Sequence, residues 1–303
     1  MKNTIKICGI ALALTCSLAA NLQAQDLYVA NYDGDTIGEY GLNGSTVNAS
    51  LITGLSGPKG IATSGGDLFI SVWATGTIGE YTTSGATVNA SLINGLAQPA
   101  GVAISGNDLF VANNSGLGSY IGEYTTSGAT VNANLISGLD DASGVSVAAS
   151  GSDLYVANYY GNTIGEYTTS GSTVNASLIT GLDGPFSMAI SENDLFVANW
   201  VSGTIGEYTT SGSTVNASLI SGLDAPQGLA ISGNDLFVAI SGGGNNSIGE
   251  YTLTGATVNT DLVSGLNGPA FLAVVPEPSV WALAGPGAAA LWLWRRKLIV
   301  SNR

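Results

Sequence analysis

The chain carries short apolar runs separated by glycine-bearing turns, and this pattern repeats six times. Each copy holds four extended candidates: a run like GIAIS, the segment DLFVAN or DLYVAN, the segment TIGEYT and the segment TVNASLI. The copies of the second segment begin at Asp26, Asp67, Asp108, Asp153, Asp194 and Asp235. Four strands in roughly 40 residues are typical of one blade of a β-propeller.

The phase of the repeats predicts a closed ring. The first copy begins at its second strand, and the missing first strand returns after the sixth copy, as residues 268–274. Pairing this last strand with the first blade would hide two unpaired strand edges, whereas an open stack needs polar caps. We therefore expect an all-β, six-bladed β-propeller over residues 25–275, closed by a C-terminal strand, with a β-solenoid as the alternative.

Alternation within a copy predicts where each strand lies in its blade. The DLFVAN segment is apolar on both faces, as expected for a strand between neighbouring blades. In TVNASLI the apolar residues alternate with Thr, Asn and Ser, which is the pattern of a strand with one polar face. We expect this segment to be the outer edge strand of each blade.

The amino-acid composition excludes several classes of function. The 303 residues carry a formal charge of −14 and include no histidine. Nucleic acids and anionic membranes require a positive surface, so we exclude both as main partners. Chemistry led by an imidazole is excluded as well. An apolar fraction of 45% with 9% charged residues indicates a folded chain with a core.

The N-terminal residues predict export. Lys2 and Lys6 precede an apolar run over residues 7–20, and a small-residue site ends at Ala24, which is the order of a secretory signal peptide over residues 1–24. Both cysteines, Cys8 and Cys16, lie in this segment. The mature chain would therefore contain neither disulfides nor thiols. A lipoprotein anchored through Cys16 is the alternative.

The C-terminal residues 276–303 combine three features in order. A Pro276-Glu277-Pro278 triplet precedes an apolar stretch over residues 280–294, and basic residues that include Arg295 and Arg296 follow it. This tail resembles the PEP-CTERM sorting signal of Gram-negative bacteria. The resemblance implies processing by an exosortase-type protease, transient membrane association of the tail, and a place at the cell envelope, the cell surface or outside the cell. An ordinary membrane anchor is the alternative.

The propeller geometry predicts where a binding site would lie. Loops from the second to the third strand and loops from the fourth strand to the next blade emerge on one face. Aromatic and amide side chains occur there, and aromatic rings beside amides suit sugar rings. The candidate ligand-binding residues are Tyr32, Trp73, Asn114, Tyr159 and Trp200. The alternative is that these aromatics only cap the inner strands.

Two adjacent acids break the repeat at Asp140 and Asp141, where other copies have a Gly-Pro turn. They are candidate calcium ligands, although acids in a loop are more often solvated. No other cofactor is predicted. A glutamate and an aspartate recur in every copy. Because residues present in all blades are expected to stabilise the blade itself, we expect a structural role for both.

The succession GPxGIA, DLFVAN and IGEY resembles the blades of NHL-like and streptogramin-lyase-like propellers. The lyase resemblance implies a histidine base near a magnesium site, which a chain without histidine cannot supply. A resemblance to lactonase-like propellers implies a metal ion in the central channel, held by Glu, Asn and Asp. We expect a non-enzymatic, surface-directed propeller that binds or scaffolds extracellular polysaccharide. The alternatives are a metal-dependent lyase or hydrolase with its site at the channel mouth, and an adaptor for an envelope protein.

Overall fold

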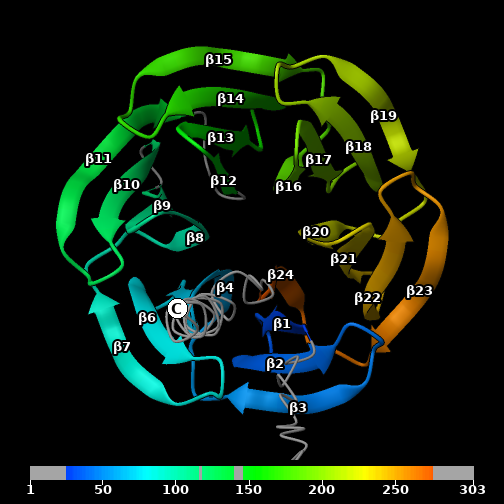
Figure 1. Ribbon diagram of the computed structural model, residues 1–303, viewed down its shortest axis with the longest axis horizontal. Coiled ribbons are helices and arrows are strands. Elements are labelled where there is room, and N and C mark those ends of the chain that lie inside the picture. Colours follow the sequence, from blue (N-terminus) through cyan, green and yellow to red (C-terminus); the bar gives the residue numbers. More distant parts are fainter. Residues whose placement is uncertain (1–24, 116–117, 140–145, 276–303) are drawn as a thin grey trace, which may run out of the picture. The chain divides into compact units, whose positions relative to one another are not determined.

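The computed structural model describes residues 25–275 except 116–117 and 140–145. The predicted signal peptide, the predicted sorting tail and both candidate calcium ligands, Asp140 and Asp141, lie outside the described residues. The described residues form 24 strands in six four-stranded sheets, which stand around a common axis as the blades of a propeller (Figure 1). They contain no helix that is long and apolar enough to cross a membrane.

Each blade runs outward from an innermost first strand to an exposed fourth strand. The first blade comprises β24 (Pro269–Val274), β1 (Asp26–Asn31), β2 (Thr36–Gly41) and β3 (Thr46–Ile52). The second and third blades comprise β4 (Pro58–Ser64), β5 (Asp67–Val72), β6 (Thr77–Thr82) and β7 (Thr87–Ile93), then β8 (Pro99–Ser105), β9 (Asp108–Asn114), β10 (Ser119–Thr125) and β11 (Thr130–Leu139). The fourth, fifth and sixth blades comprise β12 (Val147–Ser150), β13 (Asp153–Asn158), β14 (Thr163–Thr168) and β15 (Thr173–Thr180), then β16 (Pro185–Ser191), β17 (Asp194–Asn199), β18 (Thr204–Thr209) and β19 (Thr214–Ile220), then β20 (Pro226–Ser232), β21 (Asp235–Gly242), β22 (Asn245–Thr252) and β23 (Thr257–Ser264).

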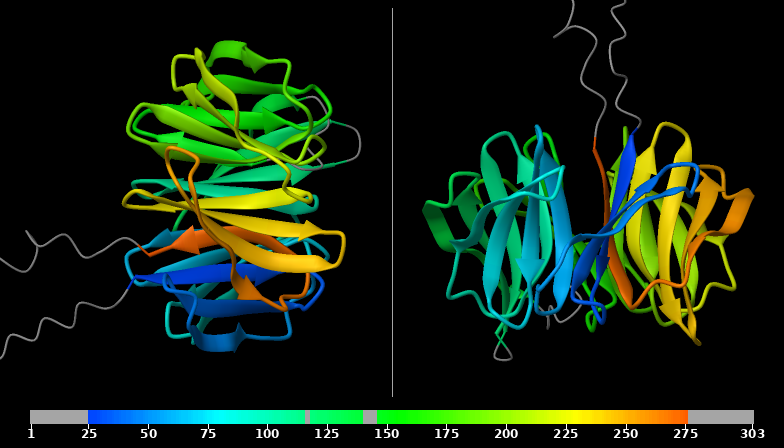
Figure 2. Two further views of the ribbon diagram at one scale, coloured as in Figure 1. Left: turned by 90° about the vertical axis from the view of Figure 1, so that its right-hand side faces the viewer. Right: turned by 90° about the horizontal axis from the view of Figure 1, so that it is seen from below.

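The first and last strands close the ring. β1 pairs antiparallel with β24, with Leu27 opposite Val274 and Tyr28 opposite Ala273, and the two strands lie side by side in both orthogonal views (Figure 2). The closing strand therefore covers the edge of β1 that would otherwise be unpaired. This pairing confirms the predicted closed propeller and excludes the open solenoid.

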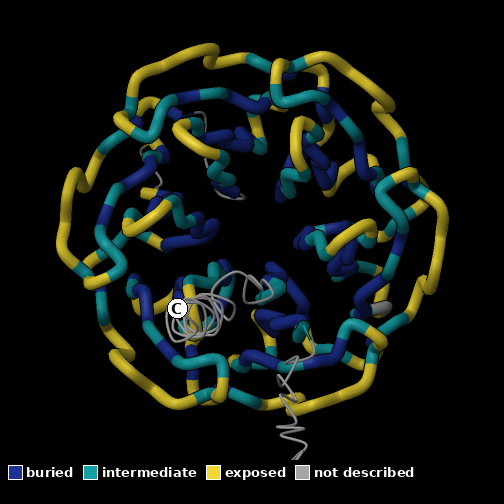
Figure 3. The backbone as a smooth tube through the Cα atoms, viewed as in Figure 1, coloured by how far each residue is buried: buried dark blue, intermediate teal, exposed yellow. Residues whose placement is uncertain are grey.

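The core lies between neighbouring blades. The second strand of each blade is buried on both faces; the adjacent residues Leu27 and Tyr28, for example, point to opposite faces and are both buried. Exposure rises outward, and the fourth strands form an exposed rim (Figure 3). On that rim Val47 is 56% exposed, so the apolar face of the outer strand is open as well as the polar one. The prediction of an outer edge strand is confirmed.

Candidate functional site

The two sets of loops that we predicted to share a face are bonded to each other. The backbone N–H of Trp73 donates to the carbonyl of Gly57 at 3.0 Å, and that of Trp200 donates to the carbonyl of Gly184 at 2.9 Å. In each case the loop after a second strand is held by the loop that enters the same blade. The backbone at both tryptophans is therefore fixed before any ligand arrives.

Side chains also tie these loops across to the next blade. Asp35 and Asn162 end their loops in the left-handed region, with φ of 54° and 55°, which Asp and Asn tolerate better than most residues. The Oδ1 of Asp35 accepts the N–H of Gly57 at 2.8 Å, and the Oδ1 of Asn162 accepts that of Gly184 at 2.9 Å. These bonds couple the first blade to the second and the fourth to the fifth.

An array of aromatic rings crosses this face. The ring of Tyr159 lies 4.9 Å from Tyr160, 6.1 Å from Trp200 and 6.3 Å from Phe186. Phe186 in turn lies 5.9 Å from Phe271, although β20 stands between their strands in the ring. These separations fall within the range of favourable aromatic pairs. The array therefore brings together the innermost strands and the loops of several blades.

Lys59 joins the array to Trp73. Its Nζ lies 4.0 Å from the centroid of the Trp73 ring and 5.6 Å from that of Phe186, which are cation–π distances. Burial lowers the pKa of Lys59 to about 8, because the charged form loses its hydration. The only cation among residues 26–275 is therefore held against aromatic faces.

The predicted binding residues do not all meet. Tyr159 and Trp200 are in contact, and Trp73 is linked to Tyr159 through Lys59 and Phe186. Tyr32 is 37% exposed at the first blade, where a Cβ on Gly57 would lie 3.0 Å from its ring. Asn114 is only 8% exposed. Prediction from sequence missed Phe271, whose signal is a phenylalanine at the place where β20 has a glycine.

The DLFVAN or DLYVAN segment ends in asparagine in four blades, and in three of them the amide oxygen of this asparagine accepts no hydrogen bond among the described residues. The Oδ1 atoms of Asn31, Asn113 and Asn158 are buried without a hydrogen-bond partner among the described residues. Buried amide oxygens need water or a ligand. However, the described part of the chain brings no three His, Cys, Asp or Glu side chains together. Without histidine or converging carboxylates, this donor set does not fit the metal centre that the propeller resemblances imply.

The repeated glutamate of the first blade, Glu39, bonds a residue of its own blade. Glu39 accepts a hydrogen bond from the hydroxyl of Tyr28 at 3.2 Å, across the pair of strands β1 and β2. Burial, followed by the charge of Asp26, raises the pKa of Glu39, and the bond from Tyr28 opposes this rise. The expectation that such acids build the blade agrees with this geometry.

Solved structures with similar folds include both enzymes and a binding protein. A nidogen/laminin complex matches with a TM-score of 0.66 and 13% identity, over 84% of this chain and 99% of that chain. A gluconolactonase from Xanthomonas campestris gives 0.61 and 12%, over 72% and 80%. A catalytically inactive histidine-to-alanine variant of virginiamycin B lyase from Staphylococcus aureus, with quinupristin, gives 0.56 and 19%, over 84% and 93%. At these identities the likeness shows the fold.

No curated protein sequence matches the chain significantly. A family match, in contrast, covers most of the propeller, since residues 12–244 fit the pattern of one family of blade sequences. This stretch includes three strands of the first blade, the whole of the second to fifth blades and part of the sixth, with both tryptophans of the loop face. The chain therefore belongs to the Virginiamycin B lyase family.

Proposed function

We propose that this protein is an exported propeller that binds extracellular polymer through its aromatic loop face and does not catalyse a reaction. The observation that carries the proposal is the aromatic array with exposed rings at its margin. Trp200 is 38% exposed and Tyr160 is 61% exposed, and Tyr159 contacts both. Exposed aromatic faces on a rigid scaffold suit the C–H faces of sugar rings.

The missing histidine supports a non-enzymatic role. In the similar Staphylococcus aureus lyase, a variant in which alanine replaces one histidine is described as catalytically inactive. This chain has no histidine at any position, so an imidazole base is not available to it. Family membership then describes the ancestry of the blades, and function depends on the site that each member builds on them.

Both ends of the sequence support a place outside the cytoplasm. The predicted signal peptide over residues 1–24 would direct export, and an exosortase-type protease would process the tail that begins at Pro276. The propeller would then be released or held at the surface of a Gram-negative bacterium. Scaffolding of an envelope protein fits the same position, and the nidogen/laminin complex has a similar propeller fold.

A metal-dependent lyase or hydrolase is the second candidate. Family membership and the similarity to a gluconolactonase favour it. Asp140 and Asp141 are the carboxylates that would hold the metal in that case.

Glycan-array binding with and without calcium distinguishes these proposals. We expect calcium-independent binding to polysaccharide that falls about tenfold when Trp200 is changed to alanine, with no turnover of esters or glycans. Metal-dependent turnover that is lost in Asp141→Asn would instead establish the enzyme. Capture of an envelope protein without any glycan signal would establish the adaptor.

A further inference from the structure

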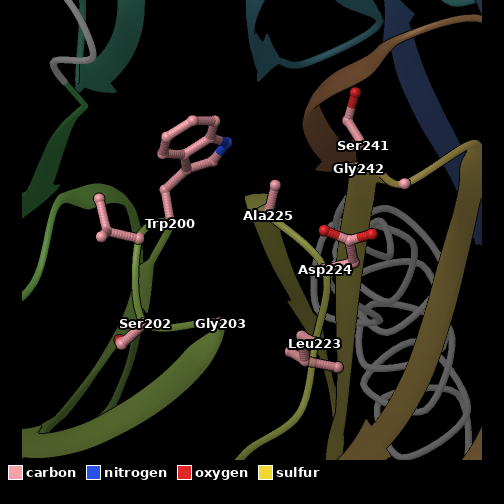
Figure 4. Close-up of a pocket in the computed structure, with 10 residues that line it drawn as sticks. Trp200, Ser202, Gly203, Leu223, Asp224, Ala225, Ser241 and Gly242 are labelled. Atoms are coloured by element: carbon pink, nitrogen blue, oxygen red, sulfur yellow. The ribbon is translucent and has the colours of Figure 1, made fainter.

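A cavity of about 460 Å³ opens between the fifth and sixth blades, beside the aromatic array. Three segments line it: residues 200–203 after β17, residues 223–225 before β20, and residues 241–243 at the end of β21. Trp200 stands on one side, with Asp224 and Ser241 across from it (Figure 4). Its volume lies in the range of small-molecule sites.

No side-chain tie among the described residues crosses this cavity. In the first and fourth blades, Asp35 and Asn162 reach the next loop and bond its backbone N–H. The fifth blade has Gly203 at the same position, with φ of 66°, so no side chain crosses to Ala225. Trp200 and Asp224 therefore face a space that a side-chain tie crosses between the first and second blades and between the fourth and fifth.

The chemistry of the walls is that of a sugar subsite. Trp200 presents an exposed indole. The carboxylate of Asp224 lies against Gly242 and Gly243, where a Cβ on either glycine would overlap a carboxylate oxygen. Both Trp200 and Asp224 line the cavity. An aromatic face beside a carboxylate that accepts two hydroxyl donors matches a pyranose ring.

The negative charge of the propeller favours a neutral polymer as the ligand. Between residues 26 and 275 the chain has 20 acidic residues and one basic residue, Lys59. Lys59 is held against Trp73 and Phe186 and lies outside the lining of this cavity. A uronate or a phosphorylated sugar would therefore meet repulsion from Asp224 and from the whole body.

We propose that this cavity is a subsite for one neutral pyranose of the polymer. The sugar ring would stack on Trp200, and its hydroxyls would donate hydrogen bonds to the carboxylate of Asp224. This assignment rests on the proposed function. It adds the class of sugar that is bound and the cavity in which the sugar lies. The equivalent tryptophan in the second blade, Trp73, lacks the acid, because the following loop has Ala97 where the cavity has Asp224.

The test uses the purified full-length protein with neutral oligosaccharides (glucan, mannan and xylan series) and with two polyanions, alginate and polygalacturonate. We expect binding of a neutral series, a loss of about tenfold in Trp200→Ala and in Asp224→Asn, and retention within about threefold in Trp200→Phe, which keeps an aromatic face. The polyanions are expected not to bind at low salt.

Two matched variants serve as controls. Asp183→Asn changes the acid at the same position of the preceding loop, and Val215→Ala changes an exposed residue of the outer rim; both should bind like the parent, and thermal midpoints check that every variant folds. If neutral glycan binding falls in Trp200→Ala but is unchanged in Asp224→Asn, the subsite is wrong and the proposed function stands. Absence of glycan binding in the parent overturns both.

Discussion

At the scale of single residues, each blade depends on a glycine that makes room for a tyrosine. In the IGEY segment the tyrosine follows the glycine by two positions, so both lie on the same face of the strand. A Cβ at Gly206 would lie 2.7 Å from the ring of Tyr208, which is 4% exposed. The ring thus lies back over its own strand and covers the glycine. This packing explains why the two residues recur together in all six copies.

Changing Gly206 to alanine should therefore displace a buried ring. We expect a loss of about 1–3 kcal/mol in the free energy of unfolding, the cost of overpacking a core, measured by urea titration. Gly66→Ala is the control, because no atom lies within 4 Å of the Cβ position in that turn and its φ is not in the left-handed region; its effect should stay below about 1 kcal/mol. Equal effects at the two positions would contradict this account.

At the scale of elements, the outer strands protect their own exposed edges. An unpaired edge strand is a template for association with another chain, and natural proteins often block it with charge or bulges. Here an asparagine accepts the backbone N–H two residues later, at 3.0–3.1 Å, in all six outer strands. In the fifth blade Asn216 accepts from Ser218, and the register with β18 shifts at that residue. One backbone donor is thus used internally, and the edge is interrupted.

Replacing Asn216 with valine should restore a continuous edge. We expect Asn216→Val to self-associate with increasing concentration, measured by size-exclusion chromatography with light scattering, because the freed N–H of Ser218 can pair with another chain. Asn216→Asp keeps an oxygen at the same place and should retain the oligomeric state of the parent. If the two variants behave alike, the asparagine does not protect the edge.

At the scale of the whole molecule, the many acidic residues make the stability of the propeller depend on pH. Burial, and then the aspartate of the same blade, raise the pKa of the recurring glutamates in the second to sixth blades, which are Glu80, Glu123, Glu166, Glu207 and Glu250. Their folded pKa values lie above those of the unfolded chain. The folded state therefore holds protons that the unfolded state releases, and stability is lost as the pH rises through this interval.

Mild acid should accordingly stabilise the propeller. We expect the thermal midpoint to be roughly 2–4 °C higher at pH 5 than at pH 7.5, because protonation relieves both the partial desolvation of these half-buried carboxylates and the repulsion among the 20 acidic residues of the propeller. Glu207→Gln should reduce the difference, and added salt should reduce it by screening the repulsion. A midpoint that is highest at neutral pH would contradict the prediction.

Much of the fold could be predicted, because the hydrophobic alternation and the turns that specify each strand are local and recur in every copy. Alternation along TVNASLI identified the outer strand, and the phase of the last copy predicted that β24 pairs with β1, as Leu27 and Val274 confirm. The candidate site was predicted only in part. Trp200 and Tyr159 were expected on one face and do meet, but Phe271 was missed, because its contact with Phe186 joins residues far apart in the sequence.

The sequence alone determined the number of blades, the order of strands within each blade and the closure of the ring, because pairing between neighbouring strands depends on short-range alternation and on turns that recur in every copy. Only the tertiary structure decided which loop residues meet. Contacts such as Lys59 with Phe186 depend on how the inner strands converge around the axis. Likewise, the cavity beside Trp200 depends on the meeting of three loops, residues 200–203, 223–225 and 241–243.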